Sequence, residues 1–119
     1  MMKKVSQENN NMKIFVDIDN TITITNGSDY INSQPLYDKI KIINDLYDDG
    51  HTITYWTARG SASGTNHYEL TKKQLNDWGV KYHDLMIGKP SYDIFIDDKT
   101  INKIEKNQIE WLIKKEEKN

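Results

Sequence analysis

Short apolar segments alternate with amphipathic segments along this chain, and this alternation restricts the fold more than any other feature. Four segments rich in β-branched and aromatic residues predict strands; they are 12–17, 52–56, 85–87 and 92–96. Three longer segments with apolar residues at helical spacing predict helices; they are 36–47, 66–78 and 101–115. The order predicts an α/β fold, a single Rossmann-like domain with a mostly parallel sheet flanked by helices.

Turn and capping residues mark the ends of the predicted helices. Pro35 suits the first turn of the first helix, and Gly50 is placed as its C-cap. Asn66, with Glu69 three residues later, resembles a capping box at the start of the second helix. Residues 21–34 are rich in Asn, Ser and Gly and predict a loop or a small hairpin.

The length of the chain fits one domain, because 119 residues can build a single hydrophobic core. We expect a disordered N-terminal extension at 1–11, the folded core at 12–115 and a charged tail at 116–119. The three tryptophans, Trp56, Trp78 and Trp111, are expected in the core.

Charge and cysteine content exclude several classes of protein. With 16 basic and 18 acidic residues, the chain has no electrostatic footprint for nucleic acid or an anionic membrane. The lack of cysteine excludes a disulfide framework, a thiolate metal site and a cysteine nucleophile. The first residues lack the apolar region of a secretory signal, and no stretch approaches the roughly 20 apolar residues that span a bilayer. We therefore expect a cytoplasmic protein that binds neither nucleic acid nor membrane.

Polar side chains follow each of the four predicted strands. In chain order they are Asp17 with Asp19, Thr57 with Arg59, Lys89, and Asp97 with Asp98. Ligands of open parallel sheets bind beyond the carboxyl ends of the strands, so these side chains predict one site on one edge. An unpaired buried carboxylate is costly. The closely spaced Asp17 and Asp19 therefore face solvent, share a cation or take part in chemistry.

Four short motifs resemble, in chain order, those of the haloacid dehalogenase-like superfamily. They are DIDNT, the WTAR segment, the GKP lysine and the IDDK aspartates. In detail the chain resembles the small capless phosphatases linked to capsular polysaccharide biosynthesis. The resemblance implies Mg²⁺-dependent hydrolysis of a phosphomonoester through an aspartyl-phosphate intermediate. It also implies a small phosphorylated substrate, such as a sugar or a related capsule precursor.

The resemblance further implies a role for each matched residue. Asp17 is the nucleophile, and Asp19 is the general acid and base. The implied metal ligands are Asp17, Asp19 through its backbone carbonyl, Asp97 and, directly or in an outer shell, Asp98. The residues implied to bind the phosphoryl group or the substrate are Thr57, Ala58, Arg59 and Lys89.

Arg59 is the only arginine in the chain, and two interpretations of it stay open. Its planar fork could clamp the phosphate or a second anionic group of the substrate at the mouth of the site. It could equally belong to a surface salt bridge.

The segments 20–34 and 60–89 are too short to hold a cap domain, so we expect an open site. The segment 20–34 and the loop 60–64 would then help to select the substrate, and a homo-oligomer could supply a lid.

Other functions remain to be weighed against the hydrolase. A signalling receiver domain also uses a phosphate-accepting aspartate, but it places the acidic pair after its first strand, whereas here the pair comes last. A catalytically idle binding module would not need the complete set of motif residues. A sugar-phosphate phosphotransferase and a nucleic-acid end phosphatase are related alternatives, and the near-neutral charge argues against the latter.

Overall fold

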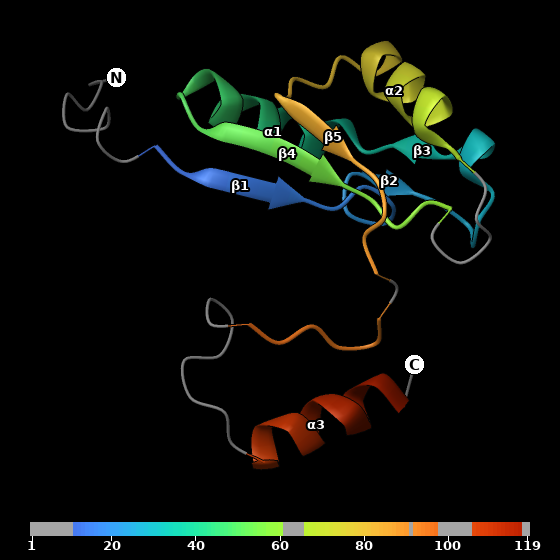
Figure 1. Ribbon diagram of the computed structural model, residues 1–119, viewed down its shortest axis with the longest axis vertical. Coiled ribbons are helices and arrows are strands. Elements are labelled where there is room, and N and C mark those ends of the chain that lie inside the picture. Colours follow the sequence, from blue (N-terminus) through green and yellow to red (C-terminus); the bar gives the residue numbers. More distant parts are fainter. Residues whose placement is uncertain (1–10, 61–65, 91, 98–105, 118–119) are drawn as a thin grey trace.

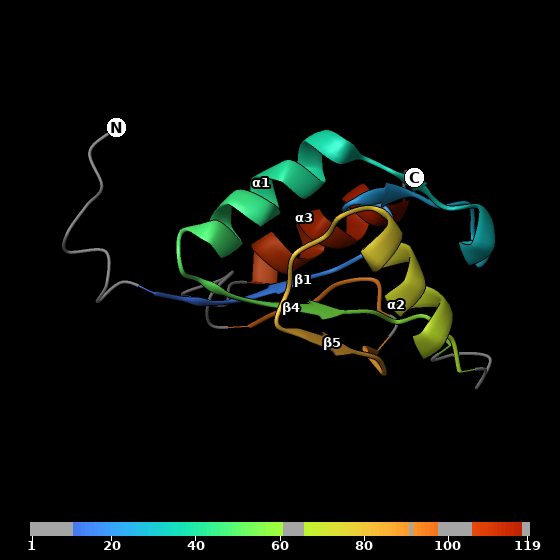
Figure 2. The same cartoon turned by 90° about the horizontal axis from the view of Figure 1, so that it is seen from above.

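The protein is a small α/β domain built on a three-stranded parallel sheet. The computed structural model describes residues 11–60, 66–90, 92–97 and 106–117. The elements, in chain order, are β1 (Lys13–Val16), β2 (Thr23–Ile24), η2 (Tyr30–Asn32), β3 (Gln34–Pro35), α1 (Tyr37–Asp48), β4 (Thr52–Trp56), α2 (Tyr68–Asp77), β5 (Asp84–Met86) and α3 (Lys106–Glu117). Helices α1 and α2 lie over the same face of the sheet (Figures 1 and 2). The described ranges contain no second domain, as predicted.

The sheet has the strand order β1-β4-β5, and both of its pairings are parallel. Val16 at the end of β1 pairs with Tyr55, and Trp56 at the end of β4 pairs with Met86. The carboxyl ends of all three strands therefore meet at one edge, so the residues that follow the strands are brought together.

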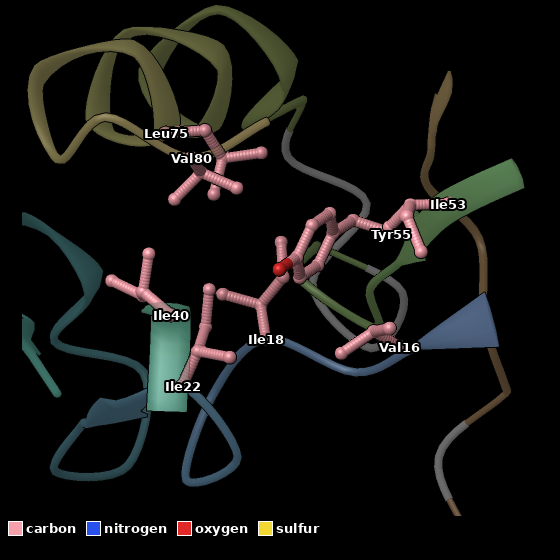
Figure 3. Packing of buried hydrophobic residues seen from close by; sticks show 8 residues of the cluster. All are labelled: Val16, Ile18, Ile22, Ile40, Ile53, Tyr55, Leu75 and Val80. Atoms are coloured by element: carbon pink, nitrogen blue, oxygen red, sulfur yellow. The ribbon is translucent and has the colours of Figure 1, made fainter. Parts of the chain in front are cut away.

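The core lies between this sheet and the two helices that cover it. Ile53 and Tyr55 of β4 are both fully buried, and they pack with Ile40 of α1 and Leu75 of α2 (Figure 3). The two β4 residues are two positions apart and therefore point to the same face of the strand. Burying an aliphatic side chain of this size contributes about 1.5–3 kcal/mol, so this layer holds the helices on the sheet.

The segment 20–34, which we call the flap, forms a small hairpin as predicted. Strands β2 and β3 pair in an antiparallel manner, with Thr23 opposite Pro35 and Ile24 opposite Gln34. The prediction that Pro35 opens the first helix is wrong, because this residue belongs to β3 and α1 begins only at Tyr37. A short strand at a sheet edge tolerates proline, since its missing N–H is not needed for a continuing ladder.

The other predicted helix ends are confirmed only in part. Gly50 lies just after α1, but the predicted capping box is not formed, because the N-cap of α2 is His67, which makes no side-chain cap hydrogen bond. Gly50 follows α1 with φ +101°, a left-handed conformation that only glycine adopts without strain. At the start of α2, the Asn66 side-chain oxygen accepts a hydrogen bond of 2.9 Å from the Tyr68 N–H. Asn66 therefore satisfies one of the free donors of the first turn.

The fourth predicted strand, 92–96, is not formed in the structure. Residues 92–97 have no ladder partner, although their β-branched and aromatic side chains favour an extended chain. The chain leaves the end of β5 through Gly88, which has φ +87°, and Pro90 follows two residues later. This turn directs the segment away from the sheet (Figure 1). Strand propensity alone cannot supply the hydrogen bonds of a neighbouring strand.

Helix α3 extends beyond the C-terminal end of its prediction. It reaches Glu117, so the predicted charged tail at 116–119 begins inside the helix, while residues 101–105 lie outside the described ranges. It lies beyond the β1 edge of the sheet (Figure 1), and Trp111 is exposed, so its predicted core position is wrong. At 100° per residue Ile109 and Ile113 share one helix face, whereas Trp111 lies on nearly the opposite one.

The two other tryptophans are half-buried, and Trp78 packs against the core.

The predicted N-terminal extension lies outside the described ranges except for Asn11. Among the helices in the described ranges, we find none with the length and apolar character that crossing a bilayer requires.

Candidate active site

The loop after β1 is a tight turn that holds Asp17 and Asp19 at the carboxyl edge of the sheet. The N–H groups of Thr21 and Ile22 both bond to the carbonyl of Ile18, at 3.1 and 2.9 Å. Asn20 lies within this turn, between Ile18 and Thr21, and has φ +63°, a conformation that asparagine tolerates better than most residues. Its side-chain oxygen accepts the Thr25 N–H at 3.0 Å, which fastens the turn to the flap.

Asp17 lies on the exposed side of this turn. Its side chain is 39% exposed, and one of its carboxylate oxygens lies 3.5 Å from Nζ of Lys89. The Lys89 ammonium also lies 5.2 Å from the centre of the Tyr92 ring, a cation–π distance. The carboxylate is therefore accessible from solvent and has a cation beside it.

Asp19 has quite different surroundings, because its carboxylate is held by a fork of donors. Arg59 donates from Nε to Oδ2 at 2.9 Å and from Nη2 to Oδ1 at 2.8 Å. Thr25 donates its hydroxyl to Oδ1 at 2.8 Å. Bidentate pairing of this kind fixes the plane of the carboxylate as well as its position.

The structure places Arg59 beneath the site and not at its mouth. Its side chain has no exposed surface, and its remaining donors go to the polar side chains of three further residues. Nη1 donates to Thr71 at 3.1 Å and to Gln74 at 2.7 Å, and Nη2 donates to Ser33 at 3.4 Å. Arg59 thus makes an ion pair, but a buried one, and the prediction that it lies at the mouth of the site is not met.

Thr57 and Ala58 connect the end of β4 to this arginine. The Thr57 hydroxyl oxygen accepts the backbone N–H of Arg59 at 3.1 Å, so its own proton can be donated to another acceptor. The Thr57 carbonyl accepts the backbone N–H of Lys89 at 3.1 Å. Thr57 therefore joins the loop after β4 to the loop after β5.

The structure thus brings together most of the residues predicted for the site. Those in direct or consecutive contact are Asp17, Asp19, Thr57, Ala58, Arg59 and Lys89. Their order along the edge follows the strand order, β1 then β4 then β5. The structure therefore places these residues together at the carboxyl edge of β1, β4 and β5.

Of the two acidic residues after the fourth predicted segment, the structure describes only Asp97. Asp97 lies in a groove of about 590 Å³ between β1 and residues 92–97, whose lining includes Phe15, Trp56 and Lys89. Within the described ranges, no three carboxylate or imidazole side chains come close enough together to hold a metal ion. Asp98 lies outside the described ranges. The described residues therefore fit the implied Mg²⁺ ligand set only in part, through Asp17 and the main chain of Asp19.

Sequence reasoning missed the residues that support Arg59. Thr25 and Ser33 come from the flap, while Thr71 and Gln74 come from α2, where both are buried. A signal was available in α2, because these two are three positions apart and so share one helix face. Two polar residues on a buried face indicate a buried polar partner.

Comparison with known proteins supports the fold. The crystal structure of a structural-genomics target from Vibrio cholerae resembles this chain with a TM-score of 0.67 and 27% sequence identity, and the match covers 88% of this chain and 98% of that one. No family model and no curated protein sequence matches the chain.

Proposed function

We propose that this protein is a phosphomonoester hydrolase that works through an aspartyl-phosphate on Asp17. The observation that carries the proposal is the different surroundings of two neighbouring carboxylates. Asp17 is accessible and lies beside Lys89, whereas Asp19 is held by Arg59 and Thr25. Carboxylates in separate environments are suited to separate roles, one as nucleophile and one in proton transfer.

In the first step a carboxylate oxygen of Asp17 attacks the phosphorus atom of the ester. The bond between phosphorus and the leaving oxygen breaks, and Asp19 in its protonated form gives its proton to that oxygen. Asp17 then carries the phosphoryl group as an acyl-phosphate, and the alcohol leaves.

In the second step water attacks the phosphorus of the acyl-phosphate. Asp19, now ionised, takes a proton from this water, and the bond between phosphorus and the Asp17 oxygen breaks. Inorganic phosphate leaves, and both carboxyl groups return to their initial protonation states. No redox partner or further reactant is needed.

Lys89 and Thr57 would bind the oxygens of the transferring group. The Lys89 ammonium is 3.5 Å from the Asp17 carboxylate, so it lies beside the place where a bound phosphoryl group would be. It would reduce the repulsion between two anions, and the Thr57 hydroxyl proton would be donated to a phosphoryl oxygen.

We also propose Mg²⁺ as the cofactor, which when bound would neutralise charge between the nucleophile and the phosphate. Asp17 and the backbone carbonyl of Asp19 are its proposed ligands within the described site. Asp97 and Asp98 are proposed as further ligands, which requires the segment that carries them to approach the β1 loop.

The proposed substrate is a phosphorylated sugar or a related precursor of a capsule polysaccharide. Support for the carbohydrate comes from the resemblance of the sequence motifs. The lack of a cap domain in the described ranges supports a substrate with a bulky leaving group. No part of the proposal involves nucleic acid or a membrane.

The proposal is tested by assaying the purified full-length chain on an aryl phosphate and a panel of sugar phosphates, with Mg²⁺ and with a chelator. We expect turnover only with Mg²⁺. Asp17→Asn should abolish both turnover and covalent phosphorylation, and Asp19→Asn should lower kcat by roughly 10²–10⁴-fold. Asp77→Asn is a matched control, because this exposed carboxylate pairs with Lys73 at the far end of α2. Turnover by Asp17→Asn at the wild-type rate, or an inactive wild type across the panel, would refute the proposal.

A further inference from the structure

Arg59 uses all of its hydrogen-bonding capacity on the protein itself. A guanidinium has five N–H donors, and the structure provides an acceptor for each: the two oxygens of Asp19, and the side chains of Ser33, Thr71 and Gln74. The Tyr30 ring covers the guanidinium carbon at 4.7 Å. No donor of Arg59 is left for a substrate phosphate.

The same contacts occupy most of the acceptor sites of Asp19. A carboxylate has about four lone-pair sites, two on each oxygen. Oδ1 accepts from Arg59 and Thr25, and Oδ2 accepts from Arg59 alone. One site therefore remains, and it is on Oδ2. The Asp19 side chain as a whole is 20% exposed.

We propose that Arg59 is a positioning residue that fixes Asp19 so that protons are transferred at its Oδ2 atom. This inference rests on the proposed hydrolase function, in which Asp19 gives a proton to the leaving group and takes one from water. A carboxylate that could rotate would present either oxygen. The fork of Arg59 prevents that rotation, because both Nε and Nη2 lose their partners if the plane turns.

The hydroxyl groups of Thr23, Thr25 and Ser33 support the same orientation of the Asp19 carboxylate. Thr25 donates its proton to Oδ1, so the Thr23 and Ser33 hydroxyls at 2.6 and 2.8 Å from Thr25 must donate to it. Thr23 in turn accepts the backbone N–H of Asn20 at 3.2 Å. Every hydroxyl proton in this hydrogen-bond network is donated toward Oδ1. Both lone pairs of Oδ1 are therefore occupied, and this atom cannot hold a proton for transfer.

Gln74 connects the fork to the flap. Its side-chain oxygen accepts from Arg59 at 2.7 Å, and its side-chain nitrogen donates to the carbonyl of Tyr30 at 2.7 Å. Gln74 thereby bonds to the flap residue whose ring covers Arg59. The flap, α2 and the β4 loop therefore jointly set the orientation of one carboxylate.

The kinetic test uses Arg59→Lys, which keeps the positive charge but replaces the fork with a single point donor. On an alkyl phosphate, whose leaving group needs a proton, we expect kcat to fall about 10²-fold, the cost of misplacing a catalytic group by about 1 Å. KM should stay close to wild type. The loss should be much smaller for 4-nitrophenyl phosphate, because its leaving group needs little protonation.

Three further variants keep the test independent of folding. Thr25→Val removes the hydroxyl that donates to Oδ1. Its kcat should fall less than that of Arg59→Lys, but the loss should again be larger for the alkyl phosphate than for 4-nitrophenyl phosphate. Thr25→Ser keeps the hydroxyl, and its kcat should show no such loss. Asn44→Ala, which removes the side-chain hydrogen bonds between α1 and the connection from α2 to β5, controls for lost stability. A raised KM with intact kcat in Arg59→Lys would overturn the inference, as would a loss of equal size for every leaving group.

A second measurement does not depend on activity. Because the chain has one arginine, ¹⁵N-arginine labelling gives a single Nε signal in a nuclear magnetic resonance spectrum. Asp19→Asn should shift this signal and speed the exchange of its proton with water, whereas Asp17→Asn should leave it unchanged. An unchanged signal in Asp19→Asn would overturn the inference.

The two proposals fail in different ways. An active wild type with a substrate-binding effect in Arg59→Lys would overturn the role of Arg59 and leave the hydrolase intact. A wild type that is inactive on all phosphate esters would overturn both, even if the labelled spectra confirm the ion pair.

Discussion

Tyr55 offers a direct test of the packing between the sheet and its helices. Its side chain is fully buried in β4, and its hydroxyl is the one buried side-chain polar atom in the described ranges that has no hydrogen-bond partner. Figure 3 shows its oxygen directed into a group of aliphatic side chains. On folding, a hydroxyl in such surroundings loses its hydrogen bonds to water and forms none with the protein to replace them.

The perturbation is Tyr55→Phe, which removes the oxygen and keeps the ring. Mutational data put the cost of an unpaired buried hydroxyl at about 1–3 kcal/mol. The ring keeps its contacts, including the edge-on packing against Tyr82 at 6.0 Å between ring centres. We therefore expect Tyr55→Phe to raise the free energy of unfolding by about 1–3 kcal/mol. For a domain of this size, that corresponds to a rise in Tm of roughly 4 °C for each kcal/mol.

The pH dependence gives the same test a second readout. Burial raises the pKa of the Tyr55 hydroxyl, so the folded chain keeps a proton that the unfolded chain loses above about pH 10. Stability should then fall as the pH rises above 10, by about 1.4 kcal/mol for each pH unit. Tyr55→Phe should lack this part of the fall. The hydrogen-bonded ion pair with Asp48 also raises the pKa of Lys81, but that contribution is common to both proteins and cancels in the difference.

Urea unfolding at pH 7 and between pH 10 and 11, followed by circular dichroism, measures both effects. Tyr37→Phe is the matched control, because Tyr37 is exposed on α1 and the change should be nearly neutral. A Tyr55→Phe protein that is less stable than wild type at pH 7 would refute the reasoning. It would show that the hydroxyl has a partner, such as a buried water.

Two further predictions concern the helix connection and the metal. Asn44→Ala should lower the free energy of unfolding by about 1–2 kcal/mol, measured by urea unfolding, because the Asn44 side chain bonds both the Gly79 carbonyl and the Lys81 N–H; a neutral change would contradict this. Asp97→Asn should weaken Mg²⁺ binding, measured by titration calorimetry, because this carboxylate is a proposed ligand of the ion. Asp84→Asn, a change at an exposed carboxylate, is the control. Equal Mg²⁺ affinity in Asp97→Asn and wild type would exclude Asp97 as a ligand.

The sequence predicted the elements whose signals are local. Strand β4, helices α1 and α2 and the flap hairpin were each marked by periodicity, glycine or capping residues within a few positions. Asp17 and Thr57 also followed from local reasoning, since a residue directly after a strand lies at the sheet edge whichever strands are neighbours. Such predictions need no knowledge of tertiary contacts.

Helix α3 formed, but the predictions of a fourth strand and of a core position for Trp111 failed, because both depend on tertiary partners. Residues 92–96 have strand composition, but strand formation needs an edge with free donors and acceptors in register. Helix α3 carries Ile109 and Ile113 on one face and Trp111 on nearly the opposite face, so its sequence does not say which face is buried. In both cases the local pattern was present and the tertiary information was missing.

Arg59 shows most clearly how tertiary contacts decide a role. Its acceptors lie 40, 26, 12 and 15 residues away, in the β1 loop, the flap and α2. The sequence indicated a planar fork near a phosphate site, which is compatible with binding either a phosphate or a carboxylate. The two uses differ in what surrounds the rest of the guanidinium. A phosphate clamp at the mouth would leave its other donors to water, whereas a buried positioning residue needs protein acceptors for all of them. Thr71 and Gln74, polar on the buried face of α2, provide those acceptors. A pair of polar residues at helical spacing after such an arginine therefore favours the buried role.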